Sequence, residues 1–245
     1  MSTIEISERD DRVVAQLNRP EVRNAIDRQL VDELHSLCAR LEGDPKVLIL
    51  IGSDGVFASG ADIEQLRDRR GADALEGINT RMFERVAALP MPVIAALDGY
   101  ALGGGAELAY AADFRIGTPR LKIGNPETGL GIIAAAGALW RLRELVGEPI
   151  AKEIVLAGRV LDAEEALACR LISRIVDPDE LLPAADELAD RINALGKEAT
   201  MATKRVFALP RHEHPEAELR EQAVLFDSEE KHRRMTAFLE KRTRS

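Results

Sequence analysis

The chain has 245 residues, 46% of them hydrophobic and 31% charged, so it is long enough to bury a large core. Its net charge of −9 disfavours nucleic acid as a partner, and no stretch approaches the ~20 apolar residues of a membrane span. The N-terminus has no basic start followed by an apolar run, and only two cysteines are present, so we expect a cytoplasmic protein without a signal peptide.

The first half of the chain alternates between strand and helix patterns. Apolar residues recur at helical spacing from Ile26 to Leu41, and the segment Ile63–Leu89 is mostly helical with a charged break at Arg67–Gly71. Alternating or continuously apolar runs predict strands at Thr3–Ser7, Arg12–Leu17, Val47–Ile51 and Val93–Leu97. The two later runs are apolar throughout, which is typical of strands covered on both faces.

The second half is mainly helical. Helical spacing predicts helices over Ala163–Arg170, Leu181–Leu195, Thr200–Leu209 and Glu216–Lys241. Short extended segments are expected at Phe114–Ile116, Leu121–Ile123, Val160–Asp162 and Ile172–Val176. No His, Cys, Asp or Glu cluster has metal-ligand spacing, and the lone pair His212 and His214 lacks further ligands, so we expect no metal.

A run of three glycines, Gly103 to Gly105, separates the strand Val93–Leu97 from the next helix. Glycine allows close approach of the backbone, and the first turn of a helix has free N–H groups with partial positive charge. A phosphate-binding loop would need G-x-G-x-x-G or a following lysine, and neither is present. Glu107 just inside the helix favours an oxyanion hole beside an acid or base, although close helix packing alone is also possible.

A second corner of small residues, Ala58–Ala61, follows the strand Val47–Ile51 and precedes a helix that begins near Asp62. Two such corners can lie side by side in an α/β protein and direct their N–H groups at one oxygen. A third segment supplies a second carboxyl group, that of Glu127. Pro126 stiffens the chain just before it.

Five motifs together resemble the crotonase family, also called the enoyl-CoA hydratase/isomerase family. They are NRPEVRNAI at Asn18–Ile26, FASGADI at Phe57–Ile63, GYALGGGAELA at Gly99–Ala109, GNPETGLG at Gly124–Gly131 and FLEKR at Phe238–Arg242. The resemblance implies an α/β fold, a crotonase-like spiral of β-β-α units over residues 1–190. It further implies a C-terminal helical region, residues 191–245, that covers the site and builds a homotrimer or a dimer of trimers.

The resemblance assigns the catalytic groups. The N–H groups of Ala61 and Gly104 would bind the thioester oxygen of an acyl-CoA, and Glu107 and Glu127 match the two acid/base positions. Two carboxyl groups are what hydration of a trans-2-enoyl-CoA needs. Relatives that isomerise the double bond often lack the acid at the Glu107 position, so a hydratase is expected. The alternatives are an enoyl-CoA isomerase and a non-catalytic acyl-CoA-binding protein.

The loop after Glu127 departs from the family pattern, since alanines stand at Ala134, Ala135 and Ala138 where relatives carry proline and glycine. In relatives a backbone N–H at the Ala135 position helps to hold the catalytic water, so the change puts the water's position in question. Trp140 is either a core residue or a wall of the acyl pocket.

The resemblance also implies contacts to coenzyme A, which enters as part of the substrate, so no separate cofactor is expected. Candidate contacts are Arg23, Ala25, Ala61, Asp62, Ile63, Gly104, Ala135, Trp140 and Lys241. Arg23 and Lys241 are the candidate cations for phosphate, and each is equally consistent with a solvated surface charge.

Overall fold

The computed structural model describes residues 2–243. The chain divides into two compact units, the first ending at Ala189 and the second beginning at Asp190. Strands and most helices belong to the first unit, and the second unit is helical.

A five-stranded sheet forms the centre of the first unit, in the order β1-β2-β3-β4-β6. Its strands are β1 (Ile4–Glu8), β2 (Arg12–Leu17), β3 (Val47–Ile51), β4 (Val93–Leu97) and β6 (Phe114–Gly117). Strands β1 and β2 form an antiparallel hairpin, and the other neighbours are parallel. All five residues of β4 are buried, which agrees with its continuously apolar sequence.

A second, three-stranded sheet has the order β5-β7-β8. Its strands are β5 (Tyr100–Leu102), β7 (Lys122–Gly124) and β8 (Val160–Asp162). Strand β5 pairs parallel with β7, and β8 pairs antiparallel with β7. This sheet carries the chain directly into the glycine run, because Gly103 follows the last residue of β5.

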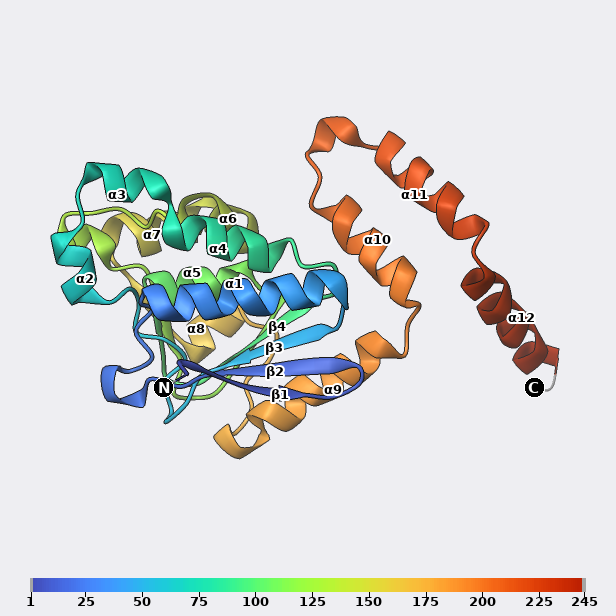
Figure 1. Ribbon diagram of the computed structural model, residues 1–245, viewed down its shortest axis with the longest axis horizontal. Coiled ribbons are helices and arrows are strands. Elements are labelled where there is room, and N and C mark those ends of the chain that lie inside the picture. Colours follow the sequence, from blue (N-terminus) through green and yellow to red (C-terminus); the bar gives the residue numbers. More distant parts are fainter. Residues whose placement is uncertain (1, 244–245) are drawn as a thin grey trace. The chain divides into compact units, whose positions relative to one another are not determined.

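Helices cover the sheets of the first unit, and α1, α4 and α5 lie over one face of the larger sheet (Figure 1). The bounds are α1 (Arg28–Gly43), α2 (Ile63–Asp68), α3 (Gly71–Glu76), α4 (Ile78–Ala87), α5 (Gly104–Ala111), α6 (Ala138–Val146), α7 (Glu148–Ala157), α8 (Ala163–Ala168) and α9 (Leu181–Asn193). Helix α1 buries the stripe of apolar residues that its helical spacing predicts, beginning with Leu30 and ending with Leu41.

The second unit contains α10 (Lys197–Phe207), α11 (Glu216–Phe226) and α12 (Glu229–Thr243). The Arg234 guanidinium on α12 donates to the carbonyl oxygens of Ala194 (3.0 Å) and Leu195 (2.7 Å), which directly follow the last residue of α9. Several apolar side chains remain exposed on these helices: Phe207, Leu219, Val224, Phe226, Met235, Phe238 and Leu239.

The first unit differs from the sequence-based expectations at three places. Ile172–Val176 is not a strand, since only Ile175 forms an isolated bridge, with Gly117. The chain instead forms strand β5 at Tyr100–Leu102, which no strand pattern predicted. Trp140 is not a core residue, because 47% of it is exposed on the first turn of α6. Helix α6 buries Ala138 and Leu142 and leaves Trp140 on its exposed side. The side that is buried depends on how α6 packs, which the sequence alone does not show.

Candidate active site

The two corners of small residues lie side by side, as their sequences predict. Ala58 donates from its N–H to the Tyr100 carbonyl (3.0 Å), and the Leu102 N–H donates back to the Ala58 carbonyl (3.0 Å). These bonds place the corner that follows β3 directly against β5, the strand that leads into the glycine run. The two strand-to-helix turns are therefore fixed to each other by backbone hydrogen bonds.

Two of the three glycines are required by the local geometry. Gly103 has a φ of +52°, in the left-handed region, and a Cβ there would lie 3.1 Å from Glu127 Oε1. A Cβ on Gly105 would lie 2.2 Å from the Ala58 carbonyl oxygen, which is far inside contact distance. Glycine at these positions thus lets α5 begin against the first corner.

The backbone nitrogens of Ala61 and Gly104 lie close to each other. A methyl group placed on Gly104 would lie 3.5 Å from the Ala61 nitrogen. Within residues 2–243, neither N–H takes part in a backbone or side-chain hydrogen bond. Gly104 is also the first residue of α5, whose N-terminus carries partial positive charge. The pair is suited to an oxygen that gains negative charge.

Glu107 is almost fully buried on α5, with 3% of its surface exposed. Its Oε1 accepts hydrogen bonds from the N–H groups of Ala136 (2.7 Å) and Ala138 (3.2 Å). Burial raises the pKa of Glu107 to about 7, the two N–H donors act in the opposite direction, and the charge of Glu127 raises it further. A carboxyl group that titrates near neutral pH can serve as an acid or a base.

Glu127 begins a short 3₁₀ helix, Glu127–Leu130, directly after Pro126. The Asn125 Nδ2 donates to Glu127 Oε1 (3.2 Å), and the Tyr110 hydroxyl donates to Asn125 Oδ1 (3.1 Å). Among the described residues, the buried Oε2 of Glu127 has no hydrogen-bond partner. Burial raises the pKa of Glu127, against the opposing hydrogen bond from Asn125. The unpartnered Oε2 is therefore the atom of Glu127 that is available to a bound molecule.

Comparison with known proteins identifies the family. A family model described as enoyl-CoA hydratase/isomerase matches residues 10–245, nearly the whole chain. The chain belongs to the enoyl-CoA hydratase/isomerase family. This assignment confirms the resemblance of its five motifs.

Named relatives of this family match over almost their full length. A probable enoyl-CoA hydratase of Mycobacterium tuberculosis is 38% identical over 242 residues, 96% of this chain and 94% of the relative. A crotonyl-CoA hydratase of Syntrophomonas wolfei is 35% identical over 97% of this chain and 95% of its own. The crystal structure of an enoyl-CoA hydratase from Bacillus anthracis has a TM-score of 0.92 at 30% identity, covering 98% of this chain and 96% of that one. The predicted fold class is thereby confirmed.

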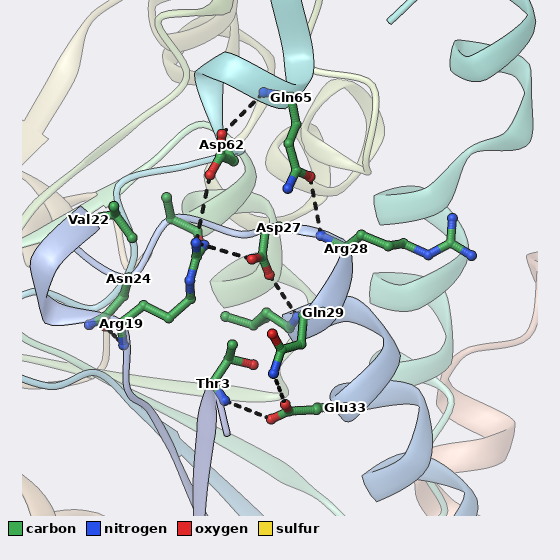
Figure 2. A network of polar contacts seen from close by, with 12 residues as sticks. Thr3, Arg19, Val22, Asn24, Asp27, Arg28, Gln29, Glu33, Asp62 and Gln65 are labelled. Carbon is green, nitrogen blue, oxygen red and sulfur yellow. Dashed lines mark hydrogen bonds and ion pairs between the residues drawn. The ribbon is translucent and has the colours of Figure 1, made fainter. Parts of the chain in front are cut away.

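A network of polar contacts supports the Ala61 corner of this family member (Figure 2). The Arg19 guanidinium lies 3.1 Å from Asp27 Oδ2 and 3.8 Å from Asp62 Oδ2, and all three side chains are largely buried. Asp62 caps α2 by accepting from the Gln65 N–H (3.2 Å), and its own N–H donates to the Ile26 carbonyl (3.1 Å). Because Asp62 follows Ala61 directly, this network holds the residue that carries the first donor.

Among the residues that the family resemblance assigns to coenzyme A, Lys241 belongs to the second unit and all the others belong to the first. Arg23 is exposed with a φ of +53°, and its carbonyl accepts from the Ser59 N–H (3.0 Å), so it borders the first corner. Ala25 is buried, and Ile63 is 58% exposed on the first turn of α2. Lys241 lies on α12 in the second unit. Their contacts to coenzyme A stay predictions.

The loop that departs from the family pattern is attached to the site in two ways. Its Ala136 and Ala138 N–H groups bind Glu107, and its Ala135 carbonyl accepts from the Thr80 hydroxyl (2.9 Å). Trp140 just beyond it stacks against the Arg141 guanidinium at 4.0 Å from the ring centroid. Sequence reasoning selected Ala135 and missed Ala136 and Ala138, and no signal in the sequence distinguishes three neighbouring alanines.

Within residues 2–243, no three His, Cys, Asp or Glu side chains are grouped to hold a metal ion. In the same residues, no helix has the length and apolar character needed to span a bilayer.

Proposed function

We propose that this chain is an enoyl-CoA hydratase, which adds water across the double bond of a trans-2-enoyl-CoA thioester. The observation that carries the proposal is the pair of carboxyl groups, Glu107 and Glu127, beside the unused N–H groups of Ala61 and Gly104. Several family relatives are named as enoyl-CoA or crotonyl-CoA hydratases, which supports the same substrate class.

The N–H groups of Ala61 and Gly104 bind the thioester oxygen. When water attacks C3, electrons move from the double bond toward that oxygen, and an enolate forms. Donors that are already in place stabilise this charge without reorganisation, and one such donor is worth on the order of 3 kcal/mol of transition-state energy. The N-terminus of α5 adds its partial positive charge.

The two carboxyl groups handle the protons. Burial raises the pKa of Glu107 to about 7, so near neutral pH part of it is ionised, and this form, which the two N–H donors on Oε1 favour, takes a proton from the attacking water. Glu127, whose buried Oε2 lacks a partner among the described residues, delivers a proton to C2. The oxygen of water ends on C3 as a hydroxyl group, its other proton passes to Glu107, and C2 gains the proton of Glu127, giving a 3-hydroxyacyl-CoA. Loss of a proton from Glu107 and uptake of one by Glu127 then restore both carboxyl groups. We expect kcat/KM to rise as the pH increases through about 7, where Glu107 ionises.

The alternatives predict different results. An enoyl-CoA isomerase needs one carboxyl group to move a proton between C2 and C4, so Glu107→Gln would abolish hydration and spare isomerisation of a 3-enoyl-CoA. A non-catalytic acyl-CoA-binding protein would bind acyl-CoA, and substitution of either glutamate would leave any residual activity unchanged. The buried, hydrogen-bonded state of Glu107 favours hydration, because an unused buried carboxyl group would cost stability.

The substrate carries its own coenzyme A, and the chain needs no separate cofactor. Arg23 is proposed to contact the coenzyme A phosphates beside the first corner, and Lys241 is proposed for a further phosphate contact. Ala25, Asp62 and Ile63 would line the path between adenine and thioester. Ala135 and Trp140 would border the acyl group.

The second unit is proposed to cover the site and to assemble the chain into a homotrimer or a dimer of trimers. Apolar side chains on α10 to α12, led by Phe207 at 88% exposure, support an interface there. The free thiols of Cys38 and Cys169 are compatible with a cytoplasmic location. Light scattering of the purified chain measures the assembly, and a monomeric mass would exclude it.

The test follows the ultraviolet absorbance of crotonyl-CoA, which falls as the conjugated double bond is hydrated. Wild type should remove the absorbance rapidly, and Glu127→Gln should slow the loss at least a hundredfold. Glu187→Gln serves as a matched control, because it removes only an exposed ion pair with Arg174. If wild type binds butyryl-CoA but leaves the absorbance unchanged, the chain is not a crotonyl-CoA hydratase.

A further inference from the structure

Asn79 faces the same region as the two backbone donors. A methyl group placed on Gly104 would lie 3.6 Å from Asn79 Nδ2 and 3.5 Å from the Ala61 nitrogen. Asn79 comes from α4, whereas Ala61 and Gly104 belong to the two corners, so three separate elements present nitrogen atoms to one place. No family motif that we quoted contains Asn79.

The amide of Asn79 is half-buried and unpaired. Within the described part of the chain, no hydrogen bond to its side chain is present. An amide with free N–H groups can donate to any acceptor that comes within hydrogen-bond distance of it. The donors of Asn79, beside the Ala61 and Gly104 nitrogens, are therefore available to a polar atom of a bound molecule.

The position of Asn79 is fixed from both sides of its helix turn. Helix α4 begins after Gly77, whose φ of +60° turns the chain sharply into the helix. The next residue, Thr80, donates from its hydroxyl to the Ala135 carbonyl, in the loop whose N–H groups bind Glu107. Helices α4 and α5 are packed against each other in the first unit. The amide is thus held on a rigid element beside the site.

We propose that Asn79 is a catalytic residue, a third hydrogen-bond donor to the thioester oxygen of the acyl-CoA. This inference rests on the proposed function and deepens it. The neutral amide donates an N–H to the oxygen while that oxygen gains charge, as the Ala61 and Gly104 N–H groups do. The protons stay on the amide nitrogen throughout, so Asn79 takes no part in acid or base chemistry.

The first experiment measures hydration of crotonyl-CoA by Asn79→Ala and Asn79→Asp. Loss of one donor should lower kcat about tenfold to a hundredfold and change KM less than threefold. The carboxylate in Asn79→Asp keeps the shape but repels the enolate, so its kcat should fall further than that of the alanine variant. Asn18→Ala is the matched control, because it removes an exposed amide that contacts Glu5, and it should retain wild-type kcat. Equal kcat for wild type and both Asn79 variants overturns the proposal.

The second experiment does not depend on turnover. An aminocinnamoyl thioester of coenzyme A absorbs at longer wavelength when its carbonyl is polarised, so its red shift on binding reports the donors directly. The shift should be smaller with Asn79→Ala than with wild type, at matched occupancy. A wild-type red shift without crotonyl-CoA hydration would reject the hydratase and leave Asn79 as a donor. Hydration with identical shifts in wild type and Asn79→Ala would keep the hydratase and reject Asn79. If the probe does not bind wild type, both proposals fail.

Discussion

The two corners that supply the backbone donors are built by different means. The Gly104 corner is held by close packing, since Gly105 lies against the Ala58 carbonyl and Gly103 lies beside Glu127. The Ala61 corner is held by side chains, through the Arg19 contacts to Asp27 and Asp62 (Figure 2). A packed corner has no room for an additional atom, whereas a network can lose one member and keep the others. The difference predicts abrupt effects of mutation at one corner and graded effects at the other.

The largest effect is expected for Gly105→Ala. Its Cβ would lie 2.2 Å from the Ala58 carbonyl oxygen and 2.8 Å from the Ala58 Cβ, so α5 must move away from the first corner. We expect the free energy of unfolding to fall by about 3 kcal/mol. Denaturant unfolding measures the stability, and crotonyl-CoA turnover should be lost with it. Gly43→Ala is the control, because a Cβ there meets no atom within 4 Å.

The second prediction concerns Glu107, on the helix that follows the packed corner, and the dependence of the free energy of unfolding on pH. Burial raises the pKa of Glu107 in the folded chain to about 7, from the ordinary value of 4.5 that the side chain has in the unfolded chain. The free energy of unfolding therefore falls as the pH rises through this interval, by about 3 kcal/mol in total. Glu107→Gln lacks this contribution, so its stability relative to wild type should increase between pH 4.5 and 8. A constant difference across that range would show that Glu107 titrates normally.

At the other corner, Arg19→Ala should reduce stability by about 2 kcal/mol, since it removes the ion pairs that Arg19 forms with the largely buried Asp27 and Asp62. Ala61 would keep its N–H but lose its support, so kcat should fall about tenfold while acyl-CoA affinity stays within threefold. Arg19→Lys restores the charge without the planar fork and should recover part of kcat. Loss of affinity with unchanged kcat would contradict a role in positioning Ala61.

The smallest effect is expected for Asp62, and it separates capping from charge. Asp62→Ala removes the cap of α2 and should cost about 1 kcal/mol. Asp62→Asn keeps a side-chain oxygen for the Gln65 N–H and loses only the charge facing Arg19, so most of the stability should return. Thermal unfolding of both variants provides the comparison, and equal losses would assign the whole contribution to charge.

Much of the fold could be predicted because its central strands are continuously apolar. The predicted bounds of Val47–Ile51 and Val93–Leu97 match the observed ones, since a short, continuously apolar run is typical of a strand covered on both faces. Strand Tyr100–Leu102 was missed because three residues beside glycines carry too little pattern, and its pairing with Lys122–Gly124 is a tertiary property.

The candidate site was predictable where its chemistry follows from backbone geometry. Small residues at both corners indicated paired N–H donors, and hydrogen bonds between Ala58 and β5 bring the corners together. The contacts of Ala136 and Ala138 with Glu107 could not be predicted, because they depend on how a long loop returns to the site. Asn79 could not be selected from the sequence, since helical periodicity does not show which polar side chain lies beside the backbone donors. The catalytic roles of all these residues stay predictions.

Both proposed oxyanion donors at the corners belong to the main chain, and this has an evolutionary consequence. A single codon change can remove the carboxyl group of Glu107 or Glu127, but no codon change other than one to proline removes the N–H of Ala61 or Gly104. Descendants of such a chain would therefore alter the fate of an enolate more readily than they would lose the ability to form it. The scaffold is suited to acquiring new thioester reactions by exchanging side chains around a fixed electrophile-activating centre.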